Sequence, residues 1–182
     1  MEKVYVFLAD GFEEIEGLTV VDVLRRAGLE VETISIMGRK EIAGSHGICV
    51  MADRVFEEKN LEDGALYVLP GGLRGMQNLH AHEGLAKLII RADEEGKRIA
   101  AICAAPSILG DMGLLGGKTA VCYPGFEEHL EGATVTQQPV EISGNITTSR
   151  GMGTALPFAL SLAEQLAGKE SADRVAEGIL YR

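Results

Sequence analysis

Residues 98–113 read RIAAICAAPSILGDMG, a short apolar run followed at once by a cysteine, two alanines and a proline. Compact apolar runs of this kind are typical of parallel strands that are buried on both faces. Pro106 stands where the first turn of a helix favours proline. The small neighbours of the cysteine leave room for a sharp turn, and they are Ala101, Ala104 and Ala105. The stretch therefore predicts a buried strand that runs directly into a helix, the repeating unit of α/β folds.

The rest of the chain alternates in the same way between apolar runs and amphipathic stretches. The apolar runs predict strands at residues 3–9, 29–36, 64–71 and 97–103. Helical spacing predicts helices at residues 13–27, 83–95, 105–115, 153–167 and 170–179. Turn signals predict hairpins at residues 41–56 and 140–150. This order predicts an α/β fold, a mostly parallel sheet with helices on both faces.

Length and composition favour one globular domain. With 182 residues and 46% hydrophobic content, the chain can bury one sizeable core, so we expect a single domain over residues 1–182. The formal net charge of −10 comes with no cluster of Lys and Arg for a nucleic-acid backbone. No apolar stretch approaches the roughly 20 residues of a membrane helix, and the first apolar run is too short for a secretory signal. We therefore expect a cytoplasmic protein that binds neither nucleic acid nor membranes.

The cysteines and histidines predict neither a disulfide framework nor a metal site. Cys49, Cys103 and Cys122 are odd in number and form no C-x-x-C pair. His80 and His82 lack a third ligand at metal spacing. Cys49, in an apolar strand of the first hairpin, and Cys122, in KTAVCYPG, are interpreted as packing residues. Cys103 is therefore the cysteine that is a candidate for chemistry.

Two interpretations of Cys103 remain open from the residues alone. A thiol at the start of a helix faces the positive end of the helix dipole, which favours the reactive thiolate. Most free cysteines, however, are small buried hydrophobic residues. A second strand exit, VLPGGLRG, places Gly71 and Gly72 at the carboxyl end of a strand, where their N–H groups could face a ligand. The same glycines could equally form a tight turn.

A carboxyl partner for Cys103 is available on the first predicted helix. Glu16 lies one turn before Val20, at the edge of the buried stripe. A carboxyl in partly apolar surroundings has a raised pKa and can stay protonated to donate a hydrogen bond. Glu13 and Glu14 fit better as ordinary first-turn residues favoured by the helix dipole. The residues alone do not choose among the three.

Five ordered strings along nearly the whole chain resemble the ThiJ/PfpI superfamily. They are LADGFEEIE (8–16), VDVLRRAG (21–28), VLPGG (68–72), AAICAAP (100–106) and TSRGMGT (148–154). The resemblance is closest to the branch of the human Parkinson-disease protein deglycase and the bacterial YajL proteins. It implies a flavodoxin-like sandwich, a homodimer and chemistry without a cofactor.

The resemblance also implies roles for particular residues. The family's cysteine nucleophile falls on Cys103, and its carboxyl partner falls on Glu16, the last residue of EEIE. Gly71 and Gly72 match the oxyanion-side loop of the family. The amide of Ala104 matches the amide that follows the nucleophile. Such backbone donors stabilise negative charge that develops on a substrate oxygen.

One position departs from the family. Where the human branch member has His-Pro, with the histidine near the cysteine, this chain has Tyr123-Pro124, and neither His46 nor His129 stands there. A Cys-His pair of the protease kind therefore has no support, which disfavours a PfpI-type peptidase or amidase. Tyr123 remains a candidate for a hydrogen bond to a substrate.

The implied function is that of a glyoxalase or deglycase, an enzyme that acts on small reactive aldehydes or glycated substrates and protects against oxidative stress. The Cys103 thiolate would attack the aldehyde carbon while Glu16 moves a proton to give a hydroxy acid. The alternative is a non-enzymatic redox sensor or chaperone that acts through oxidation of Cys103. Both functions use the same residues, so the sequence does not separate them.

Overall fold

Strand β1 (Lys3–Leu8) has both faces buried in the computed structural model, which describes residues 2–58 and 60–181. Its side chains alternate between the two faces of the sheet, with Val4, Val6 and Leu8 on one side and Tyr5 and Phe7 on the other. The run VYVFL is apolar throughout because each face meets its own hydrophobic core. The strand therefore separates two cores.

The main sheet has seven strands within the described ranges, in the order β10-β11-β7-β6-β1-β2-β5. The other six are β2 (Glu30–Ser35), β5 (Arg54–Val55), β6 (Leu66–Leu69), β7 (Arg98–Ile102), β10 (Val140–Ser143) and β11 (Ile146–Ser149). All neighbours pair in parallel except β10 and β11, which form an antiparallel hairpin. Because β1, β6 and β7 are parallel neighbours, their carboxyl ends meet at one edge of the sheet.

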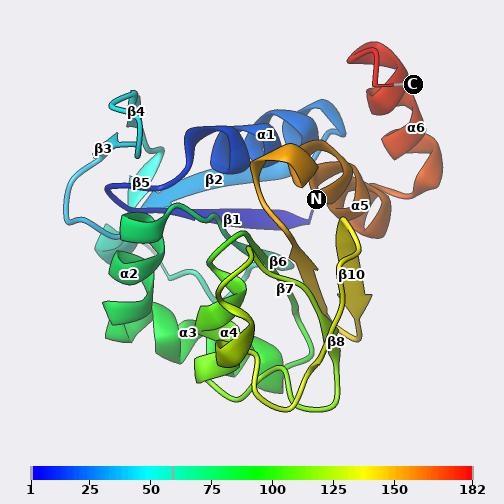
Figure 1. Cartoon of the computed structure of the whole chain (residues 1–182). Helices are drawn as coiled ribbons and strands as arrows, with labels where there is room; N and C mark the ends of the chain where they lie inside the picture. Colours follow the sequence, from blue (N-terminus) through cyan, green and yellow to red (C-terminus); the bar gives the residue numbers. More distant parts are fainter. Residues whose placement is uncertain (1, 59, 182) are drawn as a thin grey trace.

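Helices cover both faces of this sheet (Figure 1). They are α1 (Glu14–Arg26), α2 (Leu73–Ala81), α3 (Glu83–Glu94), α4 (Pro106–Asp111), α5 (Ala155–Ala167) and α6 (Lys169–Gly178). Helices α1 and α5 pack on one face and α2, α3 and α4 on the other, while α6 packs against α5. The predicted flavodoxin-like α/β fold is confirmed. No helix within residues 2–58 and 60–181 is both long and apolar enough to cross a membrane.

Small elements complete the fold outside the main sheet. Strands β3 (Glu41–Ala43) and β4 (Cys49–Met51) form an antiparallel hairpin, and β8 (Thr119–Ala120) pairs in parallel with β9 (Thr134–Val135). Short 3-10 turns are η1 (Phe56–Glu58), η2 (Glu127–His129) and η3 (Met152–Thr154). The amide of Gly11 donates to the carbonyl of Ala43 at 2.7 Å, which holds the hairpin against the loop after β1.

Most predicted elements are present within two residues of their expected bounds, and the exceptions have local causes. The hairpin expected at 41–56 ends at Met51, because residues 54 and 55 join the main sheet as β5. The helix expected at 105–115 ends at Asp111, since Gly113 follows with a φ of 77°. Helix α2 is absent from the predicted elements. The interpretation of Cys49 as a packing residue is wrong, because it is exposed on β4 of the small hairpin.

Phe158→Ala tests the core beneath α5. The Phe158 side chain is fully buried, so its truncation leaves a cavity, and we expect the free energy of unfolding to fall by about 3–5 kcal/mol. Glu164→Ala, at an exposed position of the same helix, is the control and should change this free energy by less than about 0.5 kcal/mol. Urea unfolding followed by circular dichroism measures both. Equal effects of the two substitutions would contradict this assignment of the core.

Candidate active site

Cys103 occupies the turn between β7 and α4, at the carboxyl end of a central strand. Its backbone has a φ of 66°, in the left-handed region that non-glycine residues rarely adopt. Two backbone hydrogen bonds hold this conformation, from Cys103 N to Ser149 O at 3.0 Å and from Tyr123 N to Cys103 O at 2.7 Å. Pro106 then begins the helix. The predicted sharp elbow is present, and its strain marks Cys103 as a candidate functional residue.

Residues 71 and 72 pack directly against this elbow. A Cβ atom at Gly71 would lie 2.5 Å from Cys103 Cβ and 2.5 Å from Glu16 Oε2. A Cβ atom at Gly72, where φ is 89°, would lie 2.4 Å from the carbonyl oxygen of Gly11. No side chain fits at either position. The two sequence interpretations of these glycines therefore describe one feature, a tight turn that brings backbone against Cys103.

The Glu16 side chain reaches the elbow from α1 and is only 1% exposed. Glu13 caps the helix by accepting the Glu16 amide at 2.9 Å, and Glu16 Oε2 accepts the Gly71 amide at 2.9 Å. The second oxygen, Oε1, is buried without a hydrogen-bond partner in the described part of the chain. Burial raises the pKa of Glu16 to about 7, with help from the charge of Glu13 and against hydrogen bonds from Cys103 and Gly71. The carboxyl can therefore give or accept a proton near neutral pH.

The Cys103 thiol is partly buried and hydrogen-bonds the Glu16 carboxyl. Burial raises the pKa of this thiol, and the negative charge of Glu16 raises it further. The amides of Gly72 and Ala104 hydrogen-bond the sulfur and offset this only in part. The prediction that the helix dipole favours the thiolate is therefore wrong, because burial and the charge of Glu16 raise the pKa of the thiol. When Glu16 is protonated its repulsion disappears, so the pair favours one negative charge in total.

Comparisons with known proteins identify the family of this chain. The model of the DJ-1/PfpI family matches residues 2–165. The chain belongs to the DJ-1/PfpI family. It is 40% identical over 183 residues to Protein DJ-1 homolog B of Arabidopsis thaliana, covering all of this chain but only 42% of that relative. The chain thus spans less than half the length of this longer protein.

Two further relatives match over most of both chains. A protein of Pyrococcus abyssi named as a deglycase is 34% identical over 153 residues, which is 83% of this chain and 91% of the relative. The oxidized DJ-1 of Toxoplasma gondii has a similar structure, with a TM-score of 0.95, 36% identity and coverage of 99% of this chain and 98% of that one. The resemblance to the ThiJ/PfpI superfamily is confirmed.

In this DJ-1/PfpI chain, Glu14 serves the fold although it shares the first turn of α1 with Glu16. It is 3% exposed and accepts the His46 amide at 2.8 Å and the Ser45 hydroxyl at 3.1 Å. Burial alone would raise the pKa of Glu14, but these hydrogen bonds lower it to about 2. The interpretation of Glu14 as an ordinary first-turn residue is therefore wrong, because it fastens the β3–β4 hairpin to α1.

Glu13, Glu14 and His46 form the one group in residues 2–58 and 60–181 with metal-like spacing, since their ligand atoms lie within 4.8 Å of one another. Both Glu14 oxygens already accept hydrogen bonds from the hairpin, and Glu13 Oε2 caps α1. Contacts within the fold account for this group.

Tyr123 stands where the family resemblance places a histidine, and its side chain is half-exposed. A Cβ atom at Gly151 would lie 3.4 Å from the Tyr123 ring and 3.9 Å from Glu16 Oε1. Gly151 therefore joins the site, although the sequence prediction did not single it out. The signal was its place in the string TSRGMGT.

The four histidines hold partners other than Cys103. These contacts are His46 with Glu14, His80 and His129 with Asp111, and His82 with the amide of Leu85. The described structure therefore pairs none of the four histidines with Cys103, and the sequence likewise contains no support for a Cys-His pair.

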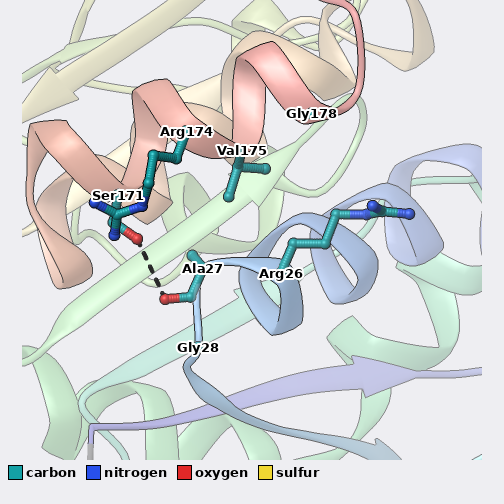
Figure 2. A pocket seen from close by; sticks show the side chains of 7 residues that line it. All are labelled: Arg26, Ala27, Gly28, Ser171, Arg174, Val175 and Gly178. Atoms are coloured by element: carbon teal, nitrogen blue, oxygen red, sulfur yellow. Dashed lines mark hydrogen bonds between the residues drawn. The ribbon is translucent and has the colours of Figure 1, made fainter.

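A separate cavity of about 360 Å³ lies between the end of α1 and α6 and contains none of the candidate residues (Figure 2). Ser171 Oγ donates to the carbonyl of Ala27 at 3.3 Å across it. Arg26 and Arg174 line this cavity but extend in different directions (Figure 2). Each is ion-paired with an acid on its own helix. The two arginines do not form a shared anion site.

Glu16→Gln tests the buried carboxyl through the pH dependence of stability. The pKa of Glu16 is raised from 4.5 to about 7, so the folded state prefers the protonated form. The stability that this contributes is complete below the lower value and is lost as the pH rises through the higher one. Glutamine does not titrate. We therefore expect wild-type protein to lose up to about 3 kcal/mol relative to Glu16→Gln between about pH 4.5 and 8.

Urea unfolding at a series of pH values measures this difference. Glu131→Gln, which changes an exposed carboxyl, is the control and should differ from wild type by a constant amount. A difference between wild type and Glu16→Gln that does not vary with pH would contradict the raised pKa.

Proposed function

We propose that this protein is a cysteine-dependent enzyme that acts on small reactive aldehydes or their adducts. Cys103 is the nucleophile and Glu16 transfers the proton. The observation that carries the proposal is the strained Cys103 elbow, which meets a buried carboxyl and two backbone donors. Strain of this kind persists where the surrounding structure holds a functional group in place. The name of the Pyrococcus abyssi relative, a deglycase, supports the substrate class.

For methylglyoxal, the proposed reaction balances with water alone. The Cys103 sulfur adds to the aldehyde carbon, so a C–S bond forms and the carbonyl oxygen becomes an oxyanion that the amides of Gly72 and Ala104 stabilise. Glu16 then moves the proton of that carbon to the neighbouring ketone carbon through an enediol. The first carbon is thereby oxidised to a thioester and the second is reduced to an alcohol. Water hydrolyses the thioester and releases lactate and the free thiol.

Glu16 is suited to this role by its position and its proton affinity. Oε1 is buried and has no hydrogen bond among residues 2–58 and 60–181, so no other group in these ranges occupies it. A pKa of about 7 lets one group act as both acid and base at neutral pH. Tyr123 lies beside the same space, and we assign its hydroxyl to a hydrogen bond with the substrate.

Conversion of methylglyoxal to lactate tests the proposal. Wild-type protein freed of metal by a chelator should produce lactate, and Cys103→Ser should produce none above background. Glu16→Gln should lower kcat by about 10²–10⁴, because one positioned proton shuttle contributes about that much. Glu16→Asp should also lower kcat, because its shorter side chain weakens the reach to the substrate. An enzymatic lactate assay measures all four proteins.

Absence of turnover with every small aldehyde tested would contradict the enzyme and favour a redox sensor. Mild peroxide would then convert Cys103 to the sulfinic acid, which mass spectrometry detects as the addition of two oxygen atoms. Hydrolysis of peptides is not expected, because the histidines are bound to other partners.

We also propose that the protein is a cytoplasmic homodimer. Large apolar side chains are exposed on α1, at Ile15 and Leu18, and on the neighbouring hairpin, at Ile48 and Met51. Exposed apolar patches of this kind are typical of protein interfaces. The cysteines at positions 49, 103 and 122 are free, which fits a reducing compartment.

Light scattering at micromolar concentration tests the dimer. Wild-type protein should give twice the 19.4 kDa mass of the chain. Ile15→Asp combined with Ile48→Asp should shift the mass toward one chain, because the interface would then bury unpaired charges. Val135→Asp, at an exposed apolar position on β9, should leave the mass unchanged. A wild-type mass of 19.4 kDa would contradict the proposal.

A further inference from the structure

A cleft of about 570 Å³ opens beside the candidate active site, between the loop after β1, the β3 segment and the start of α2. Its lining includes Asp10, Gly11, Gly44, Leu73, Arg74 and Gln77. Leu73 directly follows Gly71 and Gly72, and a Cβ atom at Gly71 would lie 2.5 Å from Cys103 Cβ. The wall of the cleft therefore continues the same loop that packs against Cys103.

The hydrogen-bond acceptors of this cleft already have partners, whereas two of its side-chain donors have none among the described residues. The Asp10 carboxylate is occupied by Arg39 at 2.5 Å and by a backbone amide at 3.1 Å. The carbonyl oxygen of Gly11 accepts a backbone amide of α2. The side chains of Arg74 and Gln77, by contrast, have no hydrogen bond to any other residue that the structure describes. A ligand that fits this inventory brings acceptors and negative charge.

Arg74 also lacks the ion pair that most arginines of this chain have. Six described arginines are paired with carboxylates, namely Arg25, Arg26, Arg39, Arg54, Arg91 and Arg174. Arg74 has no such pair within residues 2–58 and 60–181, although the chain has a formal net charge of −10. Its stem packs on the loop after β1, since a Cβ atom at Gly11 would lie 2.6 Å from Arg74 Cβ. The charge of Arg74 also acts on Asp10 in the same cleft, but the Asp10 oxygens are bound to Arg39 and to a backbone amide. Arg39 and Arg74 together therefore carry one positive charge more than Asp10 balances.

We propose that this cleft binds a carboxylate of the molecule that reacts at Cys103, with Arg74 as the residue that determines specificity. The inference rests on the proposed aldehyde chemistry and names its substrate class. That class is the adducts of reactive aldehydes with carboxylate-bearing thiols, amino acids or peptides. The Cys103 sulfur forms a bond to the former aldehyde carbon as the bond from that carbon to the carrier breaks, and the carrier leaves as the free thiol or amine with the proton of Cys103. Adducts without a negative charge bind less tightly.

The chemistry of the lining fits such a ligand along its length. The guanidinium of Arg74 can form two parallel hydrogen bonds with a carboxylate. Gln77 lies three residues further along α2, on the same helix face, and adds an amide donor. Leu73, which is 60% exposed, offers an apolar surface to the aliphatic part between the reacting carbon and the carboxylate.

Two matched substrates test the proposal. Methylglyoxal forms hemithioacetals with N-acetylcysteine and with N-acetylcysteamine, which differ only in the carboxylate. We expect wild-type KM to be about threefold to tenfold lower for the N-acetylcysteine adduct, as a charge-assisted contact implies. Arg74→Gln should remove this difference by raising KM for the N-acetylcysteine adduct to the value for the N-acetylcysteamine adduct. The preference should also weaken at high salt, because the charge of Arg74 is exposed to solvent.

Lys87→Gln makes the same change of charge on α3, outside the cleft, and should keep the wild-type preference. Turnover with equal KM for the two adducts would overturn the inference while leaving the proposed enzyme intact. A preference that persists in Arg74→Gln would overturn it as well.

A binding measurement separates this inference from the proposed reaction. N-acetylcysteine and N-acetylcysteamine are titrated into Cys103→Ser protein, and the backbone amide signals of Leu73, Arg74 and Gln77 are followed by NMR. Shifts with N-acetylcysteine alone support the carboxylate site even if no aldehyde is turned over. Absence of such shifts, or equal shifts with both compounds, would overturn it even in an active enzyme.

Discussion

The packing of Gly71 against both Cys103 and Glu16 is the contact on which the rest of the site depends. It joins the loops after β7 and β6 to helix α1, which follows β1, and these three strands are neighbours in the sheet. Parallel strands bring these loops to one edge, but the loops can touch only where one of them has no side chain. The Gly71 amide then bonds Glu16, so the contact that closes the site also orients its carboxyl.

The hydrogen-bond donors around the site are sufficient for one anion. The amides of Gly72 and Ala104 serve the sulfur, and the amide of Gly71 serves the carboxyl. Burial opposes a second charge, so the thiol and the carboxyl compete for a single ionisation. Glu14, in the same helical turn, has enough donors of its own to stay ionised. The pKa of Glu14 is therefore lowered and that of Glu16 is raised, because the loops that cover them supply different numbers of hydrogen-bond donors.

Local patterns predict most of this fold because buried parallel strands are continuous apolar runs, as in β1. Helix α2 escapes prediction since glycines surround and interrupt it, and its burial comes from the neighbouring elements. Periodicity places Glu16 at the edge of the core, but only the family resemblance selects it. The role of Glu14 depends on a hairpin 32 residues away along the chain, to which no local pattern refers. The pKa of Cys103 likewise follows from desolvation, which exists only once the loops have assembled.

At position 103, a residue that carries a thiol must adopt a left-handed backbone conformation that lowers the stability of the fold. Holding a residue with a Cβ atom at a φ of 66° costs folding free energy, on the order of 1–3 kcal/mol. Glycine would relieve this strain and remove the thiol in the same step. In a lineage that no longer used the sulfur, natural selection would cease to oppose that exchange, and drift toward glycine would be favoured. If Cys103 has the proposed role, the amino acid found at this one position in related proteins would therefore record whether the thiol is still in use.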